Sequence, residues 1–203
     1  MRIIGGKMRG KKLASPETEA TRPTSDRARE SLFNILDNYL RRLEKPWADV
    51  VFADVFAGTG AVGIEALSHG AKFGCFFEID KGALKSLRQN LNGIEKQTVI
   101  LGDALNPPRA ESIMKTFAHT AGVSGTGMPS APQAVDILFM DAPYRRGLWE
   151  QALIQFDRQG WINADTYIVI EIDKGENGTL PSGFDLSDKR AYGRNTFLFV
   201  RKN

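Results

Sequence analysis

The stretch that decides the fold is Val50-Val51-Phe52-Ala53-Asp54-Val55-Phe56-Ala57-Gly58-Thr59-Gly60-Ala61-Val62-Gly63. Its first seven residues form an apolar run interrupted by one aspartate, which is typical of a strand buried inside a parallel sheet. The glycines that follow predict a tight turn over residues 58–60, and residues 61–69 continue with a helical pattern. The stretch therefore predicts a strand, a turn and a helix in direct succession.

The alternation of strands and helices continues toward the carboxyl end. Apolar runs predict further strands over residues 73–79, 98–101, 135–140 and 167–172, and a final hairpin over 186–192 and 197–200. Helical spacing predicts helices over residues 81–91 and 148–159. Strands that alternate with helices indicate a mostly parallel central sheet with helices on both faces. We therefore expect an α/β fold of the Rossmann-like type.

The amino-terminal part reads as a small hairpin and helix extension. Residues 1–14 predict a short hairpin around Gly5-Gly6, and residues 15–24 form a connector rich in Pro, Thr and Glu. Ser25 is a good helix cap, and the helix that follows should run to about Leu43, before Pro46. We expect residues 1–45 to form this basic extension and residues 46–203 the main domain. Residues 118–134, rich in Gly, Ser, Pro and Ala, predict a surface insertion.

Composition bounds the class of protein. A chain of 203 residues with 42% hydrophobic and 25% charged residues suits one soluble domain with a small appendage. One cysteine and two histidines argue against a disulfide framework and against a Cys or His metal site. No apolar stretch is long enough to span a bilayer, and the basic amino terminus lacks the apolar core of a secretory signal. We expect a cytoplasmic monomer that holds no metal.

Positive charge gathers at the amino terminus. The net charge is only +3, yet the first twelve residues carry five positive charges and no negative one. Such clustering is typical of a surface that contacts nucleic acid, although a solvated basic tail fits the charge alone equally well. The residues expected to contact phosphates are Arg2, Lys7, Arg9, Lys11, Lys12, Arg22 and Arg27.

The glycine turn admits two kinds of cofactor. Residues 58–63 match G-x-G-x-x-G, and Glu78, twenty residues beyond Gly58, could bind ribose hydroxyls, as in a nicotinamide oxidoreductase. Asp54 favours another ligand, because a carboxylate at this turn would repel the pyrophosphate of a dinucleotide. It would attract the sulfonium and ammonium of S-adenosylmethionine.

Three acidic residues follow three successive strands. Asp54, Glu78 and Asp103 should meet at the carboxyl edge of the sheet, where open parallel sheets bind their ligands. Any one of them could instead cap a helix or lie on the surface, but together with the glycine turn they predict a nucleoside cofactor. Asp103 could accept a hydrogen bond from the adenine amino group. The expected cofactor-binding residues are Asp54, Phe56, Gly58, Gly60, Glu78, Ile79, Asp103 and Ala104.

The fourth strand ends in Asp141-Ala142-Pro143-Tyr144, which we expect to be catalytic. An exocyclic amine on a base is a poor nucleophile because its lone pair is delocalised into the ring. Acceptors on its two N–H groups, the Asp141 carboxylate and the Ala142 carbonyl, would turn the lone pair toward a methyl donor. Pro143 restricts Ala142, and Tyr144 could stack on an extruded base. Taken in isolation, the four residues fit a turn that ends the strand better, and the cofactor motifs that precede them favour the catalytic interpretation.

With these motifs the chain resembles the bacterial 16S ribosomal RNA guanine-N2 methyltransferases. The resemblance covers nearly the whole chain and is most specific at its amino-terminal end. The matching segments are residues 1–6, 9–13, 22–27, 29–36, 54–60, 63–68 and 77–78. The family usually reads Asp-Pro-Pro-Tyr, whereas this chain has Ala142 at the first proline, so we expect a slower enzyme rather than an inactive one.

The resemblance implies transfer of a methyl group from S-adenosylmethionine to a guanine N2 in 16S rRNA, on an assembled small ribosomal subunit or a late precursor. The alternatives are a methyltransferase for another planar amino group, such as adenine N6 in DNA or a protein glutamine amide. Two more distant alternatives are a nicotinamide oxidoreductase and an RNA-binding assembly factor without catalysis.

Overall fold

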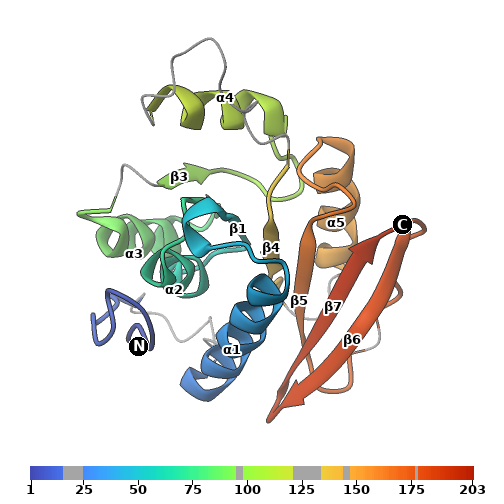
Figure 1. The fold of residues 1–203 in the computed structure, drawn as a ribbon, viewed down its shortest axis with the longest axis horizontal. Coiled ribbons are helices and arrows are strands. Elements are labelled where there is room, and N and C mark those ends of the chain that lie inside the picture. Colours follow the sequence, from blue (N-terminus) through green and yellow to red (C-terminus); the bar gives the residue numbers. More distant parts are fainter. Residues whose placement is uncertain (16–24, 95–97, 121–133, 144–146, 177) are drawn as a thin grey trace.

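The computed structural model describes residues 1–15, 25–94, 98–120, 134–143, 147–176 and 178–203 (Figure 1). These residues form one seven-stranded sheet in the order β3-β2-β1-β4-β5-β7-β6. The strands are β1 (Val51–Val55), β2 (Phe73–Phe77), β3 (Thr98–Leu101), β4 (Ile137–Met140), β5 (Tyr167–Asp173), β6 (Phe184–Tyr192) and β7 (Asn195–Lys202). Strands β1 to β5 run parallel, and β7 and β6 continue the sheet as an antiparallel hairpin.

The strand order reverses at β1. The chain builds β2 and β3 on one side of β1, and then crosses to place β4 and β5 on the other side (Figure 1). Open α/β sheets bind their ligands in a crevice where the strand order reverses, and we refer to the carboxyl ends of β1 and β4 as the crevice. This topology places the candidate site between β1 and β4.

Helices cover both faces of the sheet, as the sequence predicted. The helices α1 (Asp26–Arg42), α2 (Ala61–His69) and α3 (Lys81–Leu91) pack on one face, and α4 (Ala110–Thr120) and α5 (Leu148–Arg158) on the other. Side chains of a strand alternate between the two apolar clusters, as Phe139 and Leu138 do in β4. Among the described residues, no helix has the length and apolar character needed to span a membrane.

The amino-terminal hairpin is held against α2 by hydrogen bonds. Its pairing is limited to one antiparallel bridge between Arg2 and Lys12, with Ile3 N–H donating to the Lys11 carbonyl at 2.9 Å. The buried Glu65 carboxylate of α2 accepts hydrogen bonds from the backbone N–H groups of residues 4 and 5. The hairpin and α1 share one apolar cluster with the sheet. The boundary at residue 45 stays a prediction, since packing crosses it.

The structure corrects the sequence analysis at α4, which was not predicted. Its apolar side chains recur at Ala110, Ile113, Met114 and Phe117, a helical spacing that could have revealed it. The expected insertion over 118–134 begins inside this helix, and residues 121–133 lie outside the described part. The predicted cap is confirmed, because the Ser25 hydroxyl accepts a hydrogen bond from the Ala28 N–H at 3.2 Å.

Candidate active site at the carboxyl edge of the sheet

Asp54 and Asp141 lie on the two strands that border the crevice. Asp54 is paired in register with Phe139 of β4, and Asp141 follows Met140, the last residue of that strand. Val55 and Met140 project to the face that α4 and α5 cover. Successive side chains alternate between the faces, so their neighbours Asp54 and Asp141 project to the face that α1, α2 and α3 cover. The sequence placed these two acids at one edge, and the structure brings them onto one face as well.

The Asp54 carboxylate is buried, with 2% of the residue exposed. It accepts a hydrogen bond from the Gly63 N–H of α2 at 2.8 Å. Burial, with smaller contributions from the negative charges of Glu78 and Glu171, raises the pKa of Asp54 to about 8. The ionised form of Asp54 is therefore unfavourable in these surroundings unless a cationic ligand lies beside it.

Asp141 is a partly exposed residue directly after β4. Its backbone N–H donates to the Val55 carbonyl at 3.3 Å, but within the described residues no donor reaches its side chain. Part of the side chain is accessible and protein surrounds the rest, so that burial, followed by the charges of Glu171 and Asp54, raises its pKa well above the ordinary range. Toward the described residues, Asp141 therefore has unused acceptor capacity at the crevice.

The glycine turn between β1 and α2 adopts an unusual backbone. Phe56 has a positive φ of 65°, a rare conformation for a side chain of this size, and Gly58 and Gly60 have φ of 57° and 79°. A Cβ on Gly60 would lie 2.4 Å from Leu87 Cδ1, whereas a Cβ on Gly58 would meet no atom within 4 Å. Gly60 is thus required by packing, and Gly58 borders open space in which a ligand could lie.

The remaining predicted cofactor residues surround this turn. Glu78 accepts hydrogen bonds from the Gly58 N–H at 2.7 Å and from the N–H groups of Ile79 and Asp80, so it also braces the loop. Ile79 is 65% exposed, which is unusual for a large apolar side chain and leaves a surface for a flat ligand. The Asp103 carboxylate accepts from the Leu105 N–H and the Asn106 amide, next to the buried Ala104.

Glu171 of β5 is a candidate site residue that the sequence analysis missed. It is 1% exposed and projects from the same face as Asp54 and Asp141, and the Asn195 side-chain amide donates a hydrogen bond to it. Met140 and Ile170 are paired in register, and the residues that follow them are Asp141, directly after β4, and Glu171, within β5. The available signal was a glutamate inside the apolar run of residues 167–172.

The structure distributes the other predicted residues as follows. Ala142 is buried and Pro143 exposed, while Tyr144 and Arg22 lie outside the described part of the chain. Lys11 is half-buried, and its Nζ donates to the Asn90 carbonyl at 3.0 Å. The predicted phosphate contacts whose side chains are exposed are Arg2, Lys7, Arg9, Lys12 and Arg27.

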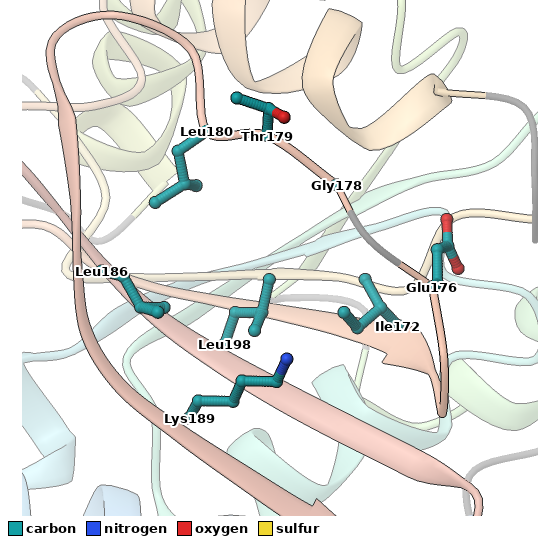
Figure 2. A pocket seen from close by; sticks show the side chains of 8 residues that line it. All are labelled: Ile172, Glu176, Gly178, Thr179, Leu180, Leu186, Lys189 and Leu198. Carbon is teal, nitrogen blue, oxygen red and sulfur yellow. The ribbon is translucent and has the colours of Figure 1, made fainter.

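A separate pocket of about 390 Å³ lies over the hairpin end of the sheet (Figure 2). Apolar side chains including Ile172, Leu180 and Leu198 line it, with Glu176 and Lys189 at its sides. Ile172 and Leu198 belong to the face that α4 and α5 cover, so this pocket is distinct from the crevice between β1 and β4. No residue predicted from the sequence as functional lines it.

Known proteins match this chain over its full length. Ribosomal RNA small subunit methyltransferase D of Escherichia coli K12 is 33% identical over 204 residues, covering 100% of this chain and 90% of the relative. The solved structure of the Escherichia coli protein yhhF, described as a candidate methyltransferase, has a TM-score of 0.72 at 27% identity and covers 100% and 98% of the two chains. An RNA methyltransferase of Salinibacter ruber, solved with S-adenosyl-L-homocysteine, shares the fold with a TM-score of 0.56 at 16% identity, over 89% and 93%.

These similarities confirm the predicted Rossmann-like methyltransferase fold. The family described as conserved hypothetical protein 95 matches residues 1–201. Because this match and the Escherichia coli relative both span nearly the entire sequence, the chain belongs to that family, the family of the ribosomal RNA small subunit methyltransferase D proteins.

Proposed function

We propose that the protein transfers the methyl group of S-adenosylmethionine to the exocyclic N2 of a guanine in 16S rRNA, on the small ribosomal subunit or a late precursor. Relatives named as ribosomal RNA methyltransferases, matched over the full chain, support an S-adenosylmethionine-dependent rRNA methyltransferase. The choice of guanine N2 rests on the motif resemblance and on the chemistry of the site.

The observation that carries the proposal is the partly exposed Asp141 at the crevice, whose carboxylate no donor of the described residues reaches. The two N–H groups of an exocyclic amine need acceptors, and Asp141 would supply one without first breaking a hydrogen bond to the described residues. The backbone carbonyl of Ala142 supplies the second, and Pro143 limits the conformations of Ala142. Acceptors fixed before the substrate arrives stabilise the developing positive charge on nitrogen without reorganisation.

The cofactor would lie across the turn between β1 and α2. S-adenosylmethionine supplies an activated methyl group on a positively charged sulfur. The buried, acidic surroundings of Asp54 suit that charge, and the open space beside Gly58 leaves room for the methionine moiety. Glu78 would accept from the ribose hydroxyls, and the exposed Ile79 would pack against the adenine.

Further groups complete the proposed assignment. Asp103 would accept from the adenine amino group beside Ala104, and Phe56 would help to shape the loop around the methionine end. The exposed cations of the hairpin, with Arg27 at the start of α1, would contact RNA phosphates. Arg22 as a phosphate contact and Tyr144 as a stacking platform stay predictions.

A transfer assay tests the proposal. Small subunits from cells that lack the modification are incubated with the protein and methyl-labelled S-adenosylmethionine, and label in RNA and in protein is counted separately. We expect label in the RNA and complete loss of transfer with Asp141→Ala, with cofactor affinity largely retained. The matched control, Asp165→Ala, changes an exposed aspartate away from the crevice and should keep full activity. Wild-type turnover by Asp141→Ala would overturn the mechanism.

A further inference from the structure

Glu171 and Asp141 stand side by side at the end of the sheet. Met140 and Ile170 are paired in register in the parallel strands β4 and β5, so Asp141, directly after β4, and Glu171, within β5, follow this pair, and the charge of Glu171 acts on Asp141. Neighbouring strands lie about 4.8 Å apart, and residues in register project to the same face. The fold therefore holds two carboxylates as a pair, one inaccessible and one partly open to the crevice.

The surroundings of this pair carry an excess of negative charge. Asp54 of β1 is in register with Phe139, two residues before Asp141. Glu78 follows β2, and Glu65 belongs to α2. On α1, Asp26 and the fully buried Arg29 face the same region. Burial lowers the pKa of Arg29, whereas Glu65, Asp26 and Glu171 oppose that change through their charges.

Arg29 offsets only part of this negative charge. Its Nη2 donates to the Arg2 carbonyl at 2.7 Å and to Asp26 Oδ1 at 2.9 Å, while its Nε and Nη1 have no hydrogen-bond partner among the described residues. The charge of Arg29 thus lies near Glu65, Asp26 and Glu171, and ionisation of the Asp54 and Asp141 carboxyl groups calls for further positive charge nearby. That charge can come from a proton or from a cationic ligand.

Methyl transfer to an amine changes the charge of the site in a defined way. The bond between the methyl carbon and the donor sulfur breaks, a bond between carbon and the amine nitrogen forms, and one N–H bond must break. The donor sulfur loses its positive charge in the same reaction, and a proton leaves the nitrogen. If the site accepts this proton, its total charge stays constant during the reaction. Its buried carboxylates are then never left ionised without a positive charge beside them.

We propose that Glu171 and Asp141 share one proton as a pair, and that this pair takes up the proton lost by the amino group. In this pair Asp141 receives the proton and Glu171 makes it a better acceptor. The inference rests on the proposed methyl transfer. Glu171 is a positioning residue, because Asp141 faces the substrate and the Asn195 amide fixes Glu171 behind it. The direction of the Asp141 pKa agrees with this role, since burial and then the charge of Glu171 make the Asp141 carboxyl group retain a proton more readily.

Proton counting during ligand binding tests the pair. Titration calorimetry of the full chain at one neutral pH, in buffers of different ionisation enthalpy, gives the protons released on binding S-adenosylmethionine or S-adenosylhomocysteine. The sulfonium replaces the shared proton and the neutral thioether does not, so the wild type should release up to about one proton more with the first ligand. In Glu171→Gln this difference should fall below half, and the acid limb of the single-turnover rate should move to lower pH.

Glu111→Gln, an exposed carboxylate on α4, is the matched control and should behave as the wild type. Equal proton release with the two ligands in the wild type would overturn the pair, whether or not the Glu171 variant folds. An unchanged acid limb in a folded Glu171→Gln protein would also overturn it. If methyl transfer proceeds normally, either result refutes the pair alone. Absence of both cofactor binding and transfer would refute the proposed function and the inference with it.

Discussion

Replacement of Asp54 by asparagine should stabilise the protein at alkaline pH while weakening its binding of the cofactor. The side chain is buried, and its pKa is raised from 3.8 to about 8, mainly because burial disfavours the carboxylate. In an unfolded chain the same group ionises near its ordinary pKa, so unfolding releases a proton at any pH between these values. The free energy of unfolding therefore falls as the pH rises through this window. Asparagine retains an acceptor oxygen for the Gly63 N–H and removes the titration.

The dependence of the unfolding free energy on pH sets the size of the expected difference. One pH unit corresponds to about 1.4 kcal/mol for one proton, so between about pH 6 and about pH 8 the wild type should lose about 2 kcal/mol relative to Asp54→Asn. Urea denaturation followed by tryptophan fluorescence at both pH values measures the two free energies of unfolding. The matched control is Asp165→Asn, an exposed aspartate whose substitution should leave the difference near zero. A stability gap that stays constant with pH, or a variant less stable than the wild type at the higher pH, would refute this account of Asp54.

Four further substitutions give three independent tests. Ala142→Pro should turn over at least as fast as the wild type, because a second proline stiffens the acceptor backbone, and a clear fall in kcat would refute this. Gly6→Ala should cost more than about 2 kcal/mol of unfolding free energy, because its Cβ would lie 2.0 Å from the Ser68 carbonyl oxygen. Gly10→Ala, with a positive φ of 87° but no atom within 4 Å of the new Cβ, should cost only about 1 kcal/mol; equal losses for the two variants would contradict the packing argument. Lys12→Ala should weaken RNA binding and lower the slope of log affinity against log salt by about one, and an unchanged slope would exclude a phosphate contact.

Much of the fold could be predicted because its signals are local. The apolar runs locate every parallel strand of the described residues to within two residues, since a strand buried on both faces needs such a run. Helix α4 was missed because a Gly- and Ser-rich stretch follows it, and the insertion predicted from this stretch begins at residue 118, inside the helix. The attachment of the hairpin to Glu65 spans about sixty residues of sequence. No local pattern encodes a contact of that kind.

The candidate site was predictable only where a residue lies at or next to the end of a strand. Asp54 is the last residue but one of β1 and Asp141 directly follows β4, so elementary topology places both at the carboxyl edge. Glu171 lies inside its run, and its relation to Asp141 depends on the register of β5 against β4, which the sequence does not reveal. Glu78 illustrates the converse case, because its predicted edge position is confirmed while its bond to Gly58 N–H adds a bracing contact that spacing alone could not indicate.

The central claim is that an acidic crevice at the ends of β1 and β4 directs a methyl group onto a guanine amine. The most direct measurement is mass spectrometry of nucleosides from small-subunit RNA after reaction with the purified protein and S-adenosylmethionine. The account predicts N2-methylguanosine in about one copy per subunit with the wild type and none with Asp141→Ala. N6-methyladenosine as the product, or no newly methylated guanosine under conditions where the cofactor binds, would contradict it.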